Sequence, residues 1–380
     1  MSESTADTEE QDREASATDP DEAARELLVD LVSIPSVSGE ERECAERLAD
    51  FFESHDREVW IDEVGNVRAP ADDGVLLTSH VDTVPGDIPV RVERVPPEEA
   101  RNGAGETADG DEGEPELWGR GSVDAKGPLA SMAVAAVRTG ASFVGVVGEE
   151  VDSRGARHLV ADREQVPEAV VNGEPSGWDG ITLGYRGLLA GTYVATSESG
   201  HSSRPENNAI QDAMDWWARV EDEFGHDEWV PVFERVTCKP VEFEGGPSAD
   251  GLSVEATMDV QLRVPPEYTT EEVRELADGH LDNGTVQWHD AVEPVMQNPR
   301  TPVGRAFRGA VRDVGGDPRL LRKTGTSDMN VYAQEWNCPM VTYGPGDSDL
   351  DHAPDEHLSL AEYDRAVAVL EAAARRLLEE

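Results

Sequence analysis

Lysine, cysteine and basic charge are all scarce in this chain of 380 residues. Its 32 basic residues include only three lysines and face 80 acidic residues, so the formal net charge is −48. Nucleic-acid binding depends on basic patches that contact phosphate, and the sequence contains none, so we expect no nucleic-acid partner. The three cysteines are far apart and lack Cys-x-x-Cys spacing. This excludes a disulfide framework and favours a cytoplasmic setting.

Long apolar runs are also missing. No stretch approaches the ~20 apolar residues of a membrane span, and the first residues contain no apolar signal-peptide core. We therefore expect no membrane association. Residues 1–20 are polar and acidic, which predicts a disordered tail.

Folded structure is nevertheless indicated, because 38% of the residues are hydrophobic and many recur with helical or strand periodicity. An acidic surface keeps a folded protein soluble in concentrated salt, where charges are screened within a few ångströms. We interpret the chain as an enzyme of a halophilic cytoplasm.

The length predicts two domains, since one core rarely grows beyond roughly 250–300 residues. Helices are expected at 21–32 and 128–137, and Ser38 to Glu41 resembles a capping box for a helix to about Ser54. Residues 95–116 are acidic and Gly-rich and predict a surface insertion. Between 184 and 291 the pattern changes to strand, helix, two strands, helix and strand, at 187–197, 207–224, 232–244, 252–264, 269–278 and 285–289. This order predicts a small α+β domain inserted into a larger α/β domain.

Acidic residues and histidine follow the apolar strands expected at 75–79, 142–147 and 169–172. In sequence order, the strands lead to His80-Val81-Asp82, to Glu149-Glu150 and to Glu174. Asp124 lies in a Gly-rich turn just before a helix. Carboxylates gathered at one edge of a sheet are costly unless cations neutralise them. The convergence therefore predicts two or more metal ions at this edge.

Each motif alone has a plainer interpretation. His80 could be an ordinary histidine at a strand end, with Asp82 beside it on the same face. Asp124 could cap a turn, and Glu149-Glu150 could be a solvated acidic turn. His352 follows a strand expected at 340–343, in a loop beside a helix-breaking proline.

Taken together, the motifs resemble the dizinc amidohydrolases, which include acetylornithine deacetylase, succinyl-diaminopimelate desuccinylase and carboxypeptidase G. The resemblance rests on Leu77 to Pro85, Gly119 to Gly127, Glu149-Glu150 and Gly173 to Pro175, and it covers nearly everything after residue 22. Residues 33–41, 153–157 and 173–187 are most similar to the branch that releases lysine or ornithine from an amino-group carrier protein.

The resemblance implies a mixed-sheet, three-layer α/β catalytic domain from residues 21–183 and 292–380. Residues 184–291 would form a lid and dimerisation domain, and the protein would be a homodimer. The family bears two divalent ions per subunit, zinc or alternatively cobalt. One would be held by His80 and Glu174, the other by Glu150 and His352, with Asp124 between them. Glu149 would be the general base, and Asp82 would orient His80 without touching metal.

Substrate contacts are less well defined. The resemblance implies that His201 reaches into a partner's active site. Arg263 is our first candidate for binding the substrate carboxylate and Arg186 the second, because guanidinium pairs well with carboxylates. Residues 325–328 match a substrate-binding segment of the family or form a helix N-cap. Residues 245–251 replace an Asn-Val-Ile-Pro segment of many members, which weakens any transfer of substrate contacts.

The implied activity is isopeptide hydrolysis that frees lysine or ornithine from a small acidic carrier, in lysine or arginine biosynthesis. A deacylase of N-acetylornithine or a related N-acyl amino acid is the alternative. A non-catalytic metal- or peptide-binding relative is the third, and the complete residue set argues against it.

Overall fold

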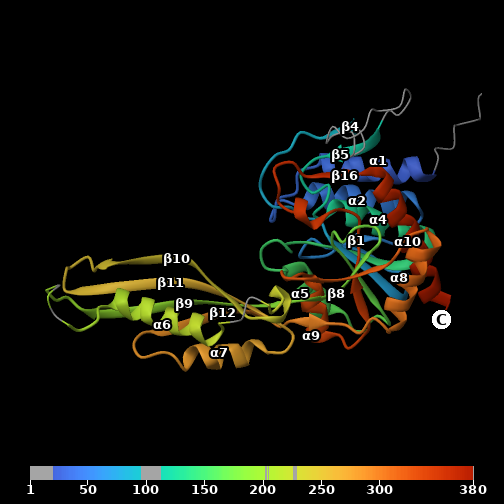
Figure 1. Ribbon diagram of the computed structural model, residues 1–380. Coiled ribbons are helices and arrows are strands. Elements are labelled where there is room, and N and C mark those ends of the chain that lie inside the picture. Colours follow the sequence, from blue (N-terminus) through green and yellow to red (C-terminus); the bar gives the residue numbers. More distant parts are fainter. Residues whose placement is uncertain (1–19, 96–112, 202, 204, 226–228, 380) are drawn as a thin grey trace, which may run out of the picture.

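A computed structural model describes residues 20–95, 113–201, 203, 205–225 and 229–379. It shows a large region and a narrower satellite region, residues 187–292, that projects from it (Figure 1). The expected acidic tail and most of the expected surface insertion lie outside the described residues. No helix among the described ranges is long and apolar enough to cross a membrane.

The large region is built on a nine-stranded mixed sheet. Its order is β1-β2-β6-β3-β7-β15-β8-β13, with β14 also paired to β8. Strands β6, β3, β7 and β15 run parallel, as do β14 and β8, and the outer pairs are antiparallel. The strands are β1 (Trp60–Ile61), β2 (Val67–Ala69), β3 (Asp72–His80), β6 (Ala141–Val146), β7 (Val170–Gly173), β8 (Gly180–Tyr185), β13 (Val295–Met296), β14 (Arg319–Lys323) and β15 (Met340–Thr342).

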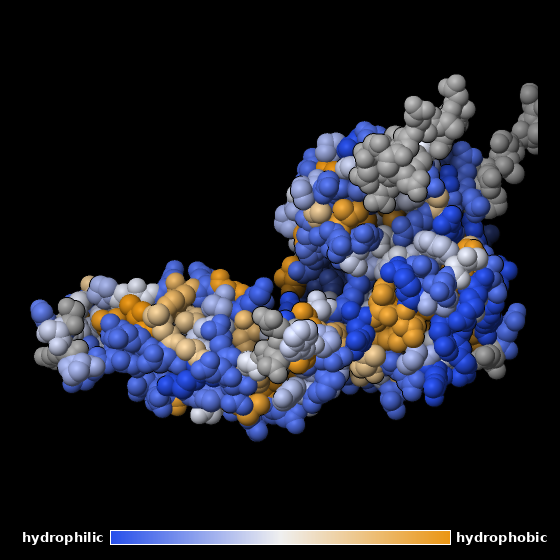
Figure 2. All heavy atoms as spheres, viewed as in Figure 1, coloured by the Kyte–Doolittle hydropathy of each residue, from blue (hydrophilic) through white to orange (hydrophobic). Residues whose placement is uncertain are grey.

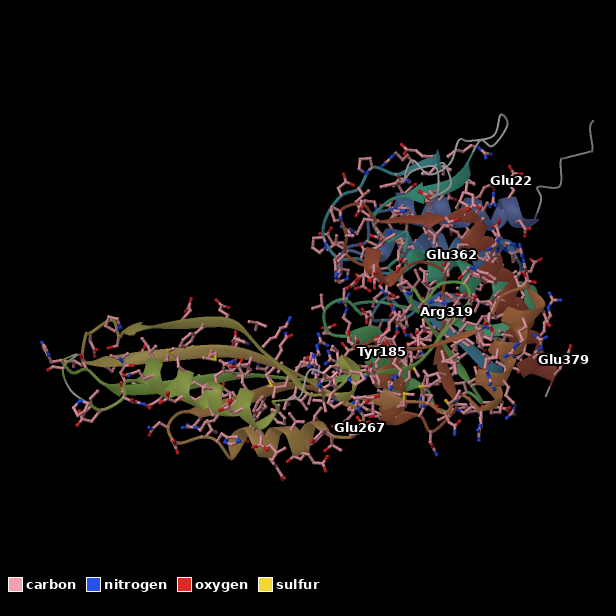
Figure 3. The ribbon with its side chains drawn as sticks, in the orientation of Figure 1. Glu22, Tyr185, Glu267, Arg319, Glu362 and Glu379 are labelled. Atoms are coloured by element: carbon pink, nitrogen blue, oxygen red, sulfur yellow. The ribbon has the colours of Figure 1, made fainter. Side chains whose placement is uncertain are left out.

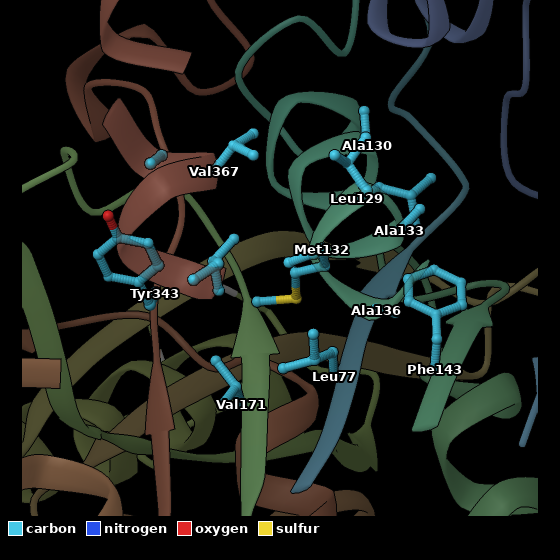
Figure 4. Packing of buried hydrophobic residues seen from close by; sticks show 14 of the residues in the cluster. Leu77, Leu129, Ala130, Met132, Ala133, Ala136, Phe143, Val171, Tyr343 and Val367 are labelled. Atoms are coloured by element: carbon cyan, nitrogen blue, oxygen red, sulfur yellow. The ribbon is translucent and has the colours of Figure 1, made fainter. Parts of the chain in front are cut away.

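Helices cover both faces of this sheet, which confirms the three-layer expectation. One face packs against α1 (Pro20–Ser33), α2 (Arg42–Ser54), α4 (Lys126–Thr139), α8 (Pro302–Asp313) and α10 (Leu360–Glu379). The other packs against α5 (Arg154–Asp162) and α9 (Asp328–Glu335). Adjacent strand residues alternate between the two cores, so Leu77 joins the first and Leu76 the second. In Figure 4, Met132 of α4 lies over Leu77 and Val171 of the sheet.

The satellite region contains a four-stranded antiparallel sheet in the order β10-β11-β9-β12. Its strands are β9 (Gly187–Glu198), β10 (Thr237–Pro247), β11 (Ser253–Val264) and β12 (Thr285–Val292), and its helices are α6 (Ala209–Glu223) and α7 (Thr270–Asp278). Both helices lie on one face (Figure 1) and enclose a separate core around Trp216. The predicted order of elements is confirmed.

Several local predictions are wrong. The stretch expected as one strand at 232–244 begins as a 3-10 turn, Val232–Glu234, and the strand starts at Thr237. Ser38 does not cap α2, because its hydroxyl donates to Asp82 instead. On α6, Met214 is 56% exposed, and the buried stripe of this helix passes through Trp216.

Some short elements were not predicted, namely strands β8, β13 and β14, helix α5 and a three-stranded sheet. The three-stranded sheet consists of β4 (Arg91–Val95), β5 (Glu114–Trp118) and β16 (His357–Ser359), in the order β16-β5-β4. They are too short or too charged for hydrophobic periodicity to reveal them.

Candidate metal centre

The candidate site lies where the parallel strands of the large sheet end. His80 is the last residue of β3, and Glu174 directly follows β7. Glu149 and Glu150 lie in the turn after β6. Because β6, β3 and β7 are adjacent and parallel, their carboxyl ends meet and bring these side chains together.

Asp124 lies between two imidazoles. Its Oδ1 is 3.1 Å from His80 Nε2, and its Oδ2 is 3.3 Å from His352 Nε2. The same His352 nitrogen is 3.1 Å from Glu150 Oε2. A carboxylate with one oxygen facing each imidazole is the arrangement that a pair of bridged metal ions requires.

Two overlapping sets of ligand atoms are spaced to hold an ion. The sets are His80, Glu149 and Glu174, and His80, Asp124 and Glu150, and the atoms of each lie within 4.8 Å of one another. The first set includes Glu149, so its carboxylate lies within 4.8 Å of the ligand atoms of His80 and Glu174. His352 joins the second set through its contacts with Asp124 and Glu150.

The electrostatics of these residues fit divalent cations. Burial, followed by neighbouring charge, raises the pKa of Glu149 and Glu174 well above the usual range, and the pKa of Glu150 to about 7. Glu150 Oε1 is buried and has no hydrogen-bond partner among the described residues. A bound cation would satisfy that oxygen and stabilise the ionised carboxylates, so the residues present fit a dinuclear metal site.

The orientation of His80 is set by the chain itself. Its Nδ1 donates to the backbone oxygen of Asp82 at 2.9 Å, which leaves Nε2 directed at Asp124. Burial alone would lower the pKa of His80, but hydrogen bonds with Asp124 and Asp82 raise it well above its usual value. The imidazole is thus held with its second nitrogen free for a metal ion.

The carboxylate of Asp82 also contacts the turn that carries Glu149 and Glu150. It lies 3.6 Å from His80 Nδ1, and it accepts hydrogen bonds from the backbone N–H groups of Glu149 and Glu150 and from the hydroxyl of Ser38. Burial opposes ionisation of Asp82, but these hydrogen bonds and His80 lower its pKa to about 2. Asp82 therefore positions the two glutamates as well as the histidine.

Glu356 plays a similar part for the turn that carries Asp124. Its buried carboxylate accepts from the backbone N–H groups of Gly121, Val123 and Asp124 and from the guanidinium of Arg120. Sequence reasoning missed this residue. Its position four residues after His352 was the only available signal, because its partners lie more than 230 residues away in the chain.

A cavity of about 500 Å³ opens beside the cluster. Its wall adds Tyr185, Arg322, Lys323, Thr324–Thr326 and Asp351 to the candidate ligands. The surface is hollowed where the satellite region joins, and Tyr185 lies near that junction (Figures 2 and 3). Asp351 Oδ1 is buried without a described partner, and burial raises the pKa of its carboxyl to about 8.

The predicted substrate residues are more scattered. His201 is exposed on the satellite region, and its Nδ1 lies 2.8 Å from the hydroxyl of Ser203. Arg263 lies at the end of β11 and donates to Thr326 at 3.4 Å, beside the cavity. Arg186 is buried, and its guanidinium donates to backbone oxygens of the junction. Ser327 caps α9, which confirms the N-cap interpretation of residues 325–328.

A carboxylate between two imidazoles, a neighbouring glutamate outside that bridge and an open cavity together define a metal-dependent hydrolase of amide bonds. The family described as Peptidase family M20/M25/M40 matches residues 76–376. The chain belongs to this family.

Curated relatives and solved structures agree with that assignment. A LysW-lysine hydrolase of Deinococcus radiodurans is 41% identical, over 94% of this chain and 98% of that protein. A putative LysW-lysine/LysW-ornithine hydrolase of Thermococcus kodakarensis is 37% identical, over 91% of this chain and 89% of that protein. Among solved structures, the M20 metallo-carboxypeptidase Sso-CP2 of Sulfolobus solfataricus has a TM-score of 0.73 at 19% identity, over 94% of this chain and 99% of that one.

Proposed function

We propose that this protein releases lysine, ornithine or both from a small acidic amino-group carrier protein by isopeptide hydrolysis. The observation that carries the reaction is Glu149, half-buried beside five candidate metal ligands. The proposed substrate is inferred from the relatives. They are named for LysW-linked lysine and ornithine, and they match over nearly their whole length.

In this proposal His80 and Glu174 would hold one ion, Glu150 and His352 would hold the other, and Asp124 would contact both. Zinc is the proposed metal, with cobalt as the alternative. When bound, such ions would supply Lewis-acid chemistry, polarising the scissile carbonyl and making a water molecule more acidic.

Glu149 supplies the proton transfer. Its carboxyl group is buried, and its pKa lies well above the usual range because of burial and the nearby Glu174. It takes the proton of the attacking water and delivers it to the nitrogen of the leaving amino acid as the carbon–nitrogen bond breaks. Asp82 holds the backbone of Glu149 in place during both transfers.

The remaining roles concern the substrate. Arg263 is proposed to bind the carboxylate of the linked amino acid, with Arg186 as the second candidate, and His201 to reach a partner's site in a homodimer. The setting proposed is biosynthesis of lysine or arginine in a halophilic cytoplasm, consistent with the cysteine content and the net charge of −48.

A direct assay tests this proposal. Metal-loaded protein in concentrated salt is incubated separately with carrier-linked lysine, carrier-linked ornithine and N-acetylornithine, and free amino acid is measured. We expect release from the carrier-linked substrates. Release from N-acetylornithine alone would contradict the proposal and identify a deacylase, whereas no release with metal confirmed bound would indicate a binding protein.

A further inference from the structure

Basic side chains without an acidic partner gather where the two regions join. Arginines elsewhere in the described chain commonly pair with a carboxylate within 4 Å, as Arg68 does with Asp62 and Arg319 with Asp179. At the junction, four cations form no such pair with any described residue: Arg186, Arg235, Arg263 and Lys323. We call this set the cationic junction. In a chain with 80 acidic residues, it is not a shortage of carboxylates that leaves these cations unpaired.

Hydrogen bonds tie the cationic junction together. The guanidinium of Arg186 donates to the backbone oxygens of Thr324, Val232 and Arg235 at 2.9, 3.2 and 3.4 Å. Its backbone N–H donates to the oxygen of Lys323. Arg186 thus joins the backbone of the segment after β14 to the backbone of the segment before β10.

Two members retain unused donors. Nε of Arg235 is buried without a hydrogen-bond partner among the described residues. The ammonium of Lys323 donates to the backbone oxygen of Pro175, and its remaining hydrogens have no acceptor among the described residues. A buried donor without an acceptor is unfavourable, so a ligand that supplies acceptors would be stabilised there.

The charges of the cationic junction repel one another. Burial, followed by the charges of Arg263 and Arg235, lowers the pKa of Arg186 to about 10. Arg322 lies next to the set but is already neutralised, because it pairs with Glu234 at 2.9 Å and stacks on Phe233. Because Lys323 shares the cavity with Glu174 and Asp351, and Asp290 acts on Arg263, the uncompensated positive charge lies at Arg186 and Arg235, on a protein that is otherwise strongly acidic.

The cationic junction borders the cavity of the metal centre. Lys323 lines the cavity and is the strand neighbour of Tyr185, which also lines it. Arg263 reaches Thr326, a third lining residue. A ligand with its amide bond at Glu149 would place its flanking groups against these side chains.

We propose that the cationic junction binds carboxylates on either side of the scissile isopeptide bond, that of the linked amino acid on one side and one of the acidic carrier protein on the other. This inference rests on the proposed function. An amino acid attached through its amine keeps its own carboxylate, and Lys323 joins Arg263 in meeting that group at the cavity. Arg235, on the satellite side, meets a carboxylate of the carrier itself. The junction explains how a chain of net charge −48 binds an acidic partner.

Arg235 provides the sharpest test, because only its backbone oxygen, and not its side chain, takes part in the hydrogen bonds that Arg186 makes at the junction. Metal-loaded full-length protein is compared with Arg235→Gln, with Arg235→Lys and with Arg312→Gln. Arg312 is an exposed arginine of α8 without an ion pair in the described structure, so its variant is a matched control for the lost charge. Thermal melts establish that each variant is folded.

We expect Arg235→Gln to raise KM for carrier-linked lysine about fivefold with kcat nearly unchanged, because a charge contact outside the reacting groups affects binding alone. Arg235→Lys should recover most of the loss, and Arg312→Gln should match the unaltered protein. Inhibition by free lysine should be the same in all four proteins, because lysine lacks the carrier's carboxylate.

Three outcomes overturn the inference. An unchanged KM in Arg235→Gln shows that the carrier does not use this residue. Weaker inhibition by free lysine, in step with KM, shows that Arg235 contacts the amino acid rather than the carrier. If the unaltered protein releases nothing from carrier-linked substrates, the proposed function fails and the inference fails with it. In the first two outcomes the proposed function stands.

Discussion

The large region and the satellite region bury their sheets in different ways. Helices cover both faces of the nine-stranded sheet, and its central strands are buried throughout, as in β6 and β7. Helices cover only one face of the satellite sheet, so β11 alternates buried Met258 and Leu262 with more exposed Glu255 and Gln261. All candidate metal ligands lie in the large region. The satellite contributes basic side chains near the cavity instead.

This difference in burial suggests that the two regions have different functions, metal binding in one and recognition of another molecule in the other. A sheet buried on both faces holds its strand ends rigidly, which suits ligands that must be placed within fractions of an ångström. A sheet with one open face presents a surface to another molecule. Chemistry should therefore depend on the large region, and recognition of the carrier on the satellite and the junction.

Glu149→Gln is the substitution in the large region that should reduce turnover most. Turnover of carrier-linked lysine should fall by roughly 10²–10⁴-fold, because the amide cannot accept the water's proton. Metal content, measured by elemental analysis, should stay at two ions per chain. Retained turnover would contradict the assignment of Glu149 as general base, and lost metal would make it a ligand instead.

Trp216→Ala tests whether the satellite region folds on its own core. Trp216 is fully buried, stacks on Tyr193 and donates to the backbone oxygen of Ala277, so truncation should destabilise the satellite by about 3–5 kcal/mol. Calorimetry should show an earlier transition while metal content is retained. Phe143→Ala is the matched change in the large region, since Phe143 lies on β6, which leads to Glu149 and Glu150. It should reduce metal binding, and equal metal loss in both variants would refute the separation of the two regions.

Glu356→Gln should lower the affinity for metal, although Glu356 is not itself a candidate ligand. The amide has only one oxygen to accept from the turn at Gly121 to Asp124, and it loses the ion pair with Arg120. Metal affinity should fall by about 10–100-fold, as measured by competition with a chelator. Saturating metal should restore most of kcat. An unaltered metal affinity would show that the turn needs no support from Glu356.

The metal-free protein should lose stability in its large region as the pH rises. Glu150, Asp328 and Asp351 have pKa values of about 7, 6 and 8 because burial disfavours their ionised forms. Each is raised above its unfolded value, so between about pH 4 and pH 8 the folded chain binds more protons than the unfolded chain, and stability falls as the pH increases.

Bound metal ions stabilise the ionised carboxylates. The difference in Tm between metal-loaded and metal-free protein should therefore widen from pH 5 to pH 8. The satellite provides an internal control, because burial raises the pKa of Tyr193 and Cys238 to about 12, beyond this range. Its transition should therefore change little. A constant difference in Tm for the large region would contradict the role of the buried carboxylates.

The candidate ligands were predictable because each lies directly beside a feature with a clear sequence pattern. His80, Glu149, Glu150 and Glu174 follow strands that appear as apolar runs, and Asp124 follows a Gly-rich turn. The chemistry of these residue types limits what such a cluster can do. Residues with long-range partners were not predictable in this way, and Glu356 is the clearest case, since nothing near it in the chain shows that it holds the Asp124 turn.

The sequence by itself determined the fold class, the order of elements in the satellite region and the candidate metal ligands, because hydrophobic periodicity and ligand chemistry are local properties. Only the tertiary structure decided that Ser38 bonds Asp82 rather than capping α2, that the backbone of Asp82 orients His80, and that Arg186, Arg235, Arg263 and Lys323 meet at one junction. Those contacts join segments up to about 140 residues apart, and the distance between such segments depends on how strands and helices pack, which no local pattern records.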